Sequence, residues 1–437
     1  MTSEWIVTEF DDAIDFQEGP GILAKDFHDH GVPLVRLSGL DRGKSLLNGC
    51  NYLNPELVAK KWAHFALQKG DILLSTSASL GRIAVVDREA VGAVAYTGIV
   101  RMRPRDSRLF APFIRYLLEG PNFQQQAEAF GAGSVIRHFG PMHLRQMTVM
   151  LPPPNEQRAI AHILGTMDER IELNRKQNET LEAIAGALFK AWFVDFEPVR
   201  AKLKGRWDFS ESLPGLPTHL YRHFPDRLIE SKLGEIPEGW EMRSLDSIAN
   251  YLNGLAMQKF PPESEINFLP VIKIAQLRAG NTSGADRAST QIKPEYIIND
   301  GDVLFSWSGS LEVEVWNGGR GALNQHLFKI TSKLVPKWFY FYATRYHLES
   351  FRAIAAGKAT TMGHIQRKHL SDAMIAVAPS QDMKIFDAVI GPIFDQIVSN
   401  EQQSRSLALL RNALLPRLIS GELRLENPEA FTMENCL

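Results

Sequence analysis

Three short segments contain residue types that could carry out chemistry. Residues 39–45, Gly-Leu-Asp-Arg-Gly-Lys-Ser, place a lysine and a serine behind two glycines, as in a phosphate-binding loop. Three residues separate these glycines, whereas the phosphate-binding motif has four between them. No convincing helix pattern follows, so we do not expect nucleotide binding at this segment.

The other two segments contain acidic and histidine residues. Asp226 with Glu230 and Lys232 resembles the acid and lysine set that holds Mg²⁺ in many nucleases, but those folds place the two acids on separate strands. His28 and His30 would need further metal ligands at suitable spacing. An Asn/Asp-Pro-Pro-aromatic methyltransferase motif is also missing. The sequence predicts a chain without catalytic residues, metal or cofactor, and a nuclease or ATPase is the enzymatic alternative.

The composition is that of a soluble globular protein. The 437 residues exceed what one core usually accommodates, and 44% are hydrophobic and 22% charged. No apolar stretch is long enough to span a membrane and the first residues do not resemble a secretory signal, so we expect a cytoplasmic protein. The net charge of −2 means that any nucleic-acid binding must come from local patches or shared surfaces.

The chain contains an internal repeat, in which matching segments recur about 230 residues later. Residues 70–75, Gly-Asp-Ile-Leu-Leu-Ser, match residues 301–306, Gly-Asp-Val-Leu-Phe-Ser. The largely apolar residues 34–40 match residues 271–277. Two copies of one module therefore fill the chain.

Each module combines a mixed α/β part with a long helix that follows prolines and continues for about 38 residues. Pro392 should kink or delay the second helix. We predict an α+β fold, with two mixed α/β domains separated by two long antiparallel helices in an internal pseudo-twofold repeat. The expected boundaries are 1–151 for domain 1, 152–196 for the central helix, 197–235 for a linker, 236–378 for domain 2, 379–425 for the C-terminal helix and 426–437 for a tail.

The two helical segments have matching heptad patterns, interrupted by polar residues at the same places, as in a coiled-coil seam. Such helices can pair with each other, and Asn174 and Asn400 would help to fix their register. Two amphipathic helices that each pack on their own domain are the alternative. The expected pairing residues are Ile160, Leu164, Met167, Ile171, Asn174, Leu181 and Leu188, and in the second helix Ile390, Ile393, Ile397, Asn400, Leu407 and Leu414.

Several segments resemble conserved regions of Type I restriction specificity subunits. Residues 151–160, Leu-Pro-Pro-Pro-Asn-Glu-Gln-Arg-Ala-Ile, and residues 187–196 resemble the central conserved region of that family. Residues 233–240 look like the usual start of its second recognition domain, and residues 410–425 are similar to its C-terminal end. The second helix departs from the pattern, because it begins Pro-Ser-Gln-Asp instead of Pro-x-x-Glu-Gln.

The resemblance implies a non-catalytic subunit of a restriction-modification system for anti-phage defence. Each domain would read one half of a bipartite double-stranded DNA target, while the helices set the spacing and dock two methyltransferase subunits. S-adenosylmethionine, ATP and Mg²⁺ are then expected in the methyltransferase and restriction/translocase partners. A rod of about 57 Å spans on the order of 17 base pairs. A helical adaptor that does not bind DNA remains an alternative.

Polar loops at equivalent places in the two domains are the candidate DNA readers, because such side chains can contact base edges or phosphates. Arg101, Arg103, Arg105 and the linker run 200–206 are further candidates, with a solvated surface as the alternative for both. The loop candidates in domain 1 are Ser38, Arg42, Lys44, Ser75, Thr76, Ser77, Arg82, Ser134, Arg137 and His138. Those in domain 2 are Gln276, Arg278, Asn281, Ser306, Trp307, Ser308, Lys358, Thr360, Thr361 and His364.

Overall fold

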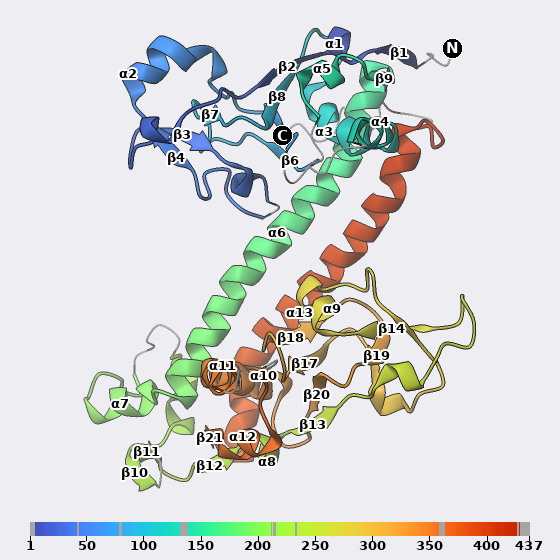
Figure 1. Ribbon diagram of the computed structural model, residues 1–437. Helices are drawn as coiled ribbons and strands as arrows, with labels where there is room; N and C mark the ends of the chain where they lie inside the picture. Colours follow the sequence, from blue (N-terminus) through green and yellow to red (C-terminus); the bar gives the residue numbers. More distant parts are fainter. Residues whose placement is uncertain are drawn as a thin grey trace. The chain divides into compact units, whose positions relative to one another are not determined.

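The chain divides into two compact units, and each unit contains part of both long helices. Unit 1 holds Met1–Glu172 and Ser406–Leu437, and unit 2 holds Leu173–Arg405. The long helices are α6 (Pro154–Phe193) and α13 (Ser380–Ile419), each of 40 residues (Figure 1). The computed structural model describes residues 5–41, 43–77, 81–131, 139–210, 212, 216–231, 234–357, 363–425 and 428.

Unit 1 is built around a four-stranded antiparallel sheet in the order β2-β8-β5-β6. A second sheet has the order β4-β3-β7, in which β3 and β7 are parallel, and β1 pairs with β9. The strands are β1 (Ile6–Glu9), β2 (Ile14–Glu18), β3 (Val32–Val35), β4 (Asn51–Leu53), β5 (Ile72–Ser75), β6 (Ile83–Val85), β7 (Val94–Ala95), β8 (Ile99–Pro104) and β9 (Thr148–Leu151). The shorter α-helices are α1 (Phe10–Ala13), α2 (Pro55–Leu57), α3 (Ala111–Glu119), α4 (Pro121–Gly131) and α5 (Pro141–Leu144).

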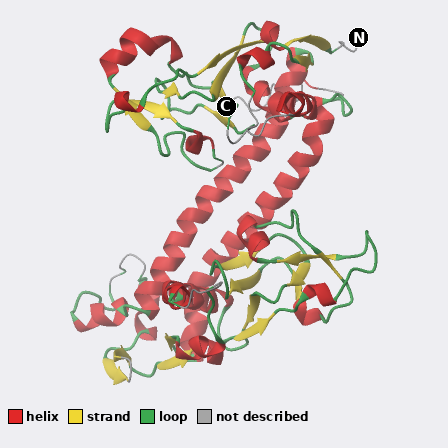
Figure 2. Cartoon of the chain, in the orientation of Figure 1, coloured by secondary structure: helices red, strands yellow, loops and turns green. Residues whose placement is uncertain are grey.

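Unit 2 repeats this topology, with an antiparallel sheet in the order β13-β20-β17-β18 and a second sheet, β15-β14-β19-β16, in which β14 and β19 are parallel (Figure 2). The internal repeat predicted from the sequence is therefore a repeat of fold. The strands are β12 (Glu241–Ser244), β13 (Asn250–Asn253), β14 (Leu269–Ile272), β15 (Arg287–Ala288), β16 (Ile297–Ile298), β17 (Asp302–Ser306), β18 (Val313–Trp316), β19 (Gly321–Leu323), β20 (Leu327–Thr331) and β21 (Met374–Val377), which pairs with β12. The shorter α-helices are α8 (Leu245–Ile248), α9 (Ile274–Ala279), α10 (Lys337–Tyr346), α11 (Leu348–Ala356) and α12 (Arg367–Asp372).

The described part of the linker, residues 197–210, 212, 216–231 and 234–235, differs from a solvated connector, because it folds onto the core of unit 2. It forms α7 (Glu197–Leu203), a 3₁₀ helix (Thr218–His223), β10 (Leu228–Ser231) and β11 (Gly234–Pro237). Trp207 and Phe224 are buried, and the rings of Phe224 and Phe386 stack with centroids 4.8 Å apart. A few buried aromatic side chains thus attach this segment to the core of unit 2, although its composition is rich in prolines and charged residues.

In unit 2, α6 and α13 pair through buried asparagines. Asn178 Nδ2 donates to the backbone oxygen of Ile397 (3.0 Å), and Asn400 Nδ2 donates to Asn178 Oδ1 (2.9 Å). Asn174 Nδ2 donates to the backbone oxygen of Asn400 (3.2 Å) and to Ser404 Oγ (3.1 Å). The contacts on α13 move backwards as α6 advances, so the helices are antiparallel, as the predicted fold class requires. Among the other seam residues of this unit, Ile390 and Ile397 are buried and Leu181, Leu188 and Ile393 are half-buried.

In unit 1, the same helices meet at a buried ion pair. Arg411, which is 6% exposed, pairs with Asp168 Oδ1. Asp168 Oδ2 accepts a hydrogen bond from the Tyr116 hydroxyl (3.1 Å) and pairs with Arg115 (3.0 Å), and both of these residues lie on α3. Burial raises the pKa of Tyr116. Of the apolar seam residues in this unit, Ile160 and Leu164 are buried and Met167, Ile171, Leu407 and Leu414 are half-buried.

The helix α13 begins at Ser380 and continues through Pro392, so the later start that we expected does not occur, and the kink stays a prediction. Pro392 lies within the first four turns of the helix, and its side chain is exposed. Within the described residues, no helix is both long and apolar enough to cross a membrane.

Candidate nucleic-acid interface

In domain 1, three loops meet at one end of the four-stranded sheet. Ser75 ends β5, and its buried hydroxyl accepts a hydrogen bond from the backbone N–H of Arg82 (2.9 Å). The N–H of Thr76 donates to the backbone oxygen of Gly98 (2.9 Å), and the N–H of Phe139 donates to that of Thr76 (3.3 Å). We call residues 75–77, 96–98 and 139 loop junction 1.

Domain 2 contains the same junction. Ser306 ends β17, and its buried hydroxyl accepts from the backbone N–H of Glu312 (2.8 Å). The N–H of Trp307 donates to the backbone oxygen of His326 (3.4 Å), and the N–H of Ile365 donates to that of Trp307 (3.0 Å). Residues 306–308, 324–326 and 365 form loop junction 2. The repeat therefore preserves the backbone hydrogen bonds of the junction while its side chains differ.

The side chains at loop junction 2 form a cluster of polar and aromatic groups. Ser308 Oγ lies 3.0 Å from His326 Nδ1, and the indole N–H of Trp307 donates to Asn253 Oδ1 (2.9 Å). The ring centroid of Trp307 lies 5.8 Å from that of His326 and 6.2 Å from that of His364. Three of the predicted loop candidates, Trp307, Ser308 and His364, are thus brought together.

Sequence reasoning missed two members of this cluster, Asn253 and His326. Asn253 is the last residue of β13, and His326 ends the short turn between β19 and β20. Both lie in or beside short segments between apolar strands rather than in long polar loops. The available signal was the triplet Asn-Gln-His at 324–326 between two apolar strands, at a place that the repeat aligns with residues 96–98.

Several predicted candidates use their side chains to hold the loops themselves. Gln276 is buried, and its Oε1 accepts from the backbone N–H of Lys273 (3.3 Å). Ser38 Oγ donates to the backbone oxygen of Asn48 (2.8 Å), and Asn281 Nδ2 donates to a backbone oxygen of its own loop (2.8 Å). A base contact by any of these side chains would compete with a bond that shapes the loop.

The charged candidates are paired with carboxylates. Lys44 Nζ lies 3.3 Å from Asp41 Oδ2, and Arg82 pairs with the other oxygen of Asp41. Arg278 Nε lies 3.1 Å from Glu312 Oε1. Surface ion pairs of this kind contribute little stability, and these cations can be shared with phosphates. Ser77 and Thr76 lie in loop junction 1, whereas Arg42, Ser134, Arg137, His138, Lys358, Thr360 and Thr361 lie outside the described residues.

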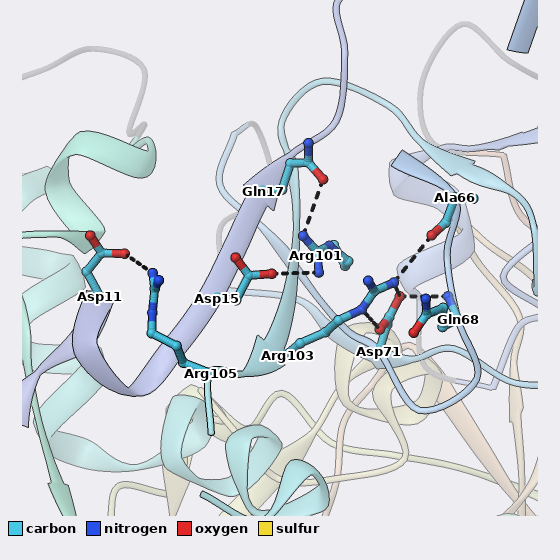
Figure 3. A network of polar contacts seen from close by, with 9 residues as sticks. All are labelled: Asp11, Asp15, Gln17, Ala66, Gln68, Asp71, Arg101, Arg103 and Arg105. Carbon is cyan, nitrogen blue, oxygen red and sulfur yellow. Dashed lines mark hydrogen bonds and ion pairs between the residues drawn. The ribbon is translucent and has the colours of Figure 1, made fainter. Parts of the chain in front are cut away.

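The three alternating arginines of β8 and its end are engaged within domain 1 (Figure 3). Arg101 is 7% exposed and lies 2.9 Å from Asp15 Oδ2. Arg103 Nη2 donates to Asp71 Oδ2 (2.7 Å), and Arg105 pairs with an aspartate of α1 (2.8 Å). The hydrogen bond that Arg103 donates to the Asp71 carboxylate raises the pKa of Arg103. Arg101 and Arg103 therefore join strands and loops to one another, whereas the side chain of Arg105 is 47% exposed, as expected at a solvated edge. A DNA contact by these arginines stays a prediction.

The basic run of residues 200–206 is also partly engaged. The side chain of Lys202 is 4% exposed, and its Nζ lies 2.9 Å from Asp226 Oδ1 and 3.9 Å from the ring centroid of Tyr221. Arg200 Nε donates to the backbone oxygen of Asp195 (3.1 Å). Asp226, which the sequence placed in a nuclease-like set, is thus the ion-pair partner of a buried lysine.

The Glu-Gln pair near the start of α6 forms hydrogen bonds with segments from the beginning, middle and end of unit 1. Glu156 is 4% exposed, and its carboxylate accepts from Trp5 Nε1 (3.1 Å) and Arg424 Nε (2.9 Å). Gln157 is fully buried and accepts from the backbone N–H of Phe110 (2.7 Å). These contacts give both residues a structural role in that unit.

The start of α13 has different residues and contacts at the two positions that match Glu156 and Gln157. Asp382 occupies the place of the glutamate and lies 2.9 Å from Nδ1 of His223. Met383 occupies the place of the glutamine and is buried in the aromatic core of unit 2. The departure from the Pro-x-x-Glu-Gln pattern therefore follows from the surroundings of this helix end.

Comparison with known proteins agrees with this architecture. The family described as "Type I restriction modification DNA specificity domain" matches residues 3–183 and again residues 237–407. A specificity subunit of the MjaIX Type I restriction enzyme from Methanocaldococcus jannaschii is 27% identical over 370 residues, covering 82% of this chain and 78% of the relative. The HindI specificity subunit from Haemophilus influenzae is 25% identical over 408 residues, covering 82% of this chain and 87% of the relative.

A solved structure has the same fold. The S subunit of a Type I restriction-modification system from M. genitalium superposes with a TM-score of 0.57 at 13% identity. The match covers 95% of this chain and 96% of that one.

Proposed function

Because the chain belongs to the Type I restriction modification DNA specificity family, we propose that domains 1 and 2 each read one half of a split double-stranded DNA target. The observation that carries this proposal is the pair of loop junctions. Their backbone hydrogen bonds match, while Thr76 and Gly98 in one correspond to Trp307 and His326 in the other. Two loop junctions with the same backbone hydrogen bonds and different side chains are suited to reading two different half-sites.

The long helices suit the role of a spacer between the half-sites. Each has 40 residues, equivalent to about 60 Å of α-helix. At 3.4 Å per base pair, this length corresponds to about 18 base pairs of DNA. The buried seam contacts Asn178–Asn400 and Asp168–Arg411 support paired, stiff helices.

The chain itself supplies recognition and no chemistry in this proposal. Two methyltransferase subunits dock on it and bring S-adenosylmethionine, and restriction/translocase subunits bring ATP and Mg²⁺, all in the cytoplasm. The net charge of −2 fits such an assembly, because partner subunits can supply the phosphate contacts that a lone DNA-binding protein would need.

The test is to express the chain with the methyltransferase subunit of its own host and to map methylated bases in the host genome. We expect methylation at one split motif that requires both proteins. If the two proteins bind DNA without any sequence preference, the DNA-reading role is wrong, and if no duplex binds at all, the adaptor alternative is supported. The purified chain alone should show no nuclease or ATPase turnover, whereas turnover that Lys44→Ala or Asp226→Ala abolishes would support the enzymatic alternative.

A further inference from the structure

The turn between β19 and β20 carries a glutamine where domain 1 has a threonine. The repeat aligns Gln325 and His326 with Thr97 and Gly98, because the backbone oxygens of His326 and Gly98 accept the equivalent junction hydrogen bonds. The serine that faces this turn is present in both domains, as Ser308 and Ser77. What distinguishes the two turns is therefore the Gln-His pair.

A hydrogen-bonded chain orients the amide of Gln325. The amide Nε2 of Gln325 lies 3.3 Å from the imidazole Nε2 of His326. An amide nitrogen can only donate, so the imidazole Nε2 of His326 is the acceptor of this hydrogen bond. His326 Nδ1 therefore carries the proton and donates to Ser308 Oγ (3.0 Å). The ring of Trp307 lies beside the imidazole and is itself held by Asn253. The side chain of Gln325 is thus positioned by groups that come from three segments of the chain.

This arrangement leaves a donor and an acceptor on Gln325 available. One amide N–H is used by His326, so the second N–H and Oε1 are not engaged by any described residue. Gln325 is half-buried, so part of the side chain is accessible. A glutamine that offers one donor and one acceptor matches N7 and N6–H₂ of adenine in the major groove.

The corresponding turn in domain 1 cannot make this contact. Thr97 Oγ1 donates to Glu18 Oε1 (3.3 Å), and the N–H of Gly98 donates to the same oxygen (2.9 Å). No amide side chain is present in residues 96–98 of this turn. The difference therefore applies to one half-site only.

We infer that Gln325 reads an adenine in the half-site of domain 2, with His326 as its positioning residue. This inference rests on the proposed DNA-reading function. It predicts one base pair whose recognition depends on N7 of the adenine and on the amide of Gln325.

The experiment uses the chain assembled with its methyltransferase subunits and a panel of duplexes. Each adenine of both half-sites is replaced in turn by 7-deazaadenine, which lacks the N7 acceptor, and binding is measured. For the wild type, one substitution in the half-site of domain 2 should weaken binding about 5- to 150-fold. Gln325→Ala should weaken binding to the unmodified duplex by a similar factor and should no longer respond to that 7-deazaadenine.

His326→Ala should reduce discrimination at that same base pair and at no other, which a general loss of structure would not do. Gln258→Ala, at an exposed glutamine of domain 2, is the matched control and should behave as the wild type. The inference is overturned if no 7-deazaadenine in this half-site weakens wild-type binding, or if Gln325→Ala retains the full response. A wild-type complex without any split-site preference would instead contradict the proposed function.

Discussion

Asp168 and Arg411 face each other across the helix seam of unit 1, and both are largely buried. The matching positions of the repeat are Phe394 and Ala185, which lie in the apolar core of unit 2. Tyr342, the counterpart of Tyr116, packs against Phe394 with ring centroids 6.2 Å apart. One module therefore contains an ion pair and the other an apolar contact at equivalent places.

We predict that Asp168→Ala lowers the free energy of unfolding by about 3–5 kcal/mol, because it leaves Arg411 buried without its partner. Urea unfolding followed by circular dichroism measures the effect. The double variant Asp168→Phe with Arg411→Ala removes both charges of the pair and should be more stable than Asp168→Ala, while Arg115 keeps its ion pair with Glu119 (3.3 Å). A single variant as stable as the wild type would mean that the pair contributes nothing.

The asparagines of unit 2 give a second prediction. Asn400→Ala removes the donor to Asn178 Oδ1, so a buried acceptor loses its hydrogen bond at a cost of about 1–3 kcal/mol. Ser399→Ala, at an exposed position one residue away, is the control and should change the unfolding midpoint little. Equal midpoints for the two variants would exclude a contribution of this asparagine pair to the seam.

Glu156 gives a third prediction. Glu156→Gln keeps the size of the side chain but removes the charge that pairs with Arg424, so the segment after α13 should detach more often. Limited proteolysis with mass spectrometry should show faster cleavage beyond Gly421 than in the wild type. Glu422→Gln, which removes a carboxylate paired on the surface with Arg417, should not accelerate it. Unchanged cleavage in Glu156→Gln would show that the contact does not hold this segment.

The sequence predicted the repeat, the two long helices and their antiparallel pairing, because heptad spacing and apolar strands leave strong periodic signals. It did not predict that the described part of residues 197–235 joins the core of unit 2, since that depends on aromatic residues such as Phe224 contacting residues far along the chain. Nor could composition reveal that Arg101 and Gln276 are occupied within the fold. Such partners are set by tertiary contacts, which single-residue types do not encode.

The candidate site was only partly predictable for the same reason. Trp307, Ser308 and His364 stood out as polar or aromatic residues in aligned loops. Gln325 and His326 lie in a short strand-to-strand turn and become candidates only when the turn is placed beside Ser308. Aligning the two modules turn by turn was the step that could have identified them.

The spacing between the two half-sites tests the central claim most directly. One heptad inserted into both α6 and α13 preserves the seam pattern and lengthens each helix by about 10.5 Å, which corresponds to about three base pairs. Methylation mapping should then show the same two half-sites with a gap about three base pairs longer. A methylated motif with an unchanged gap would contradict the account of two DNA readers held apart by paired helices.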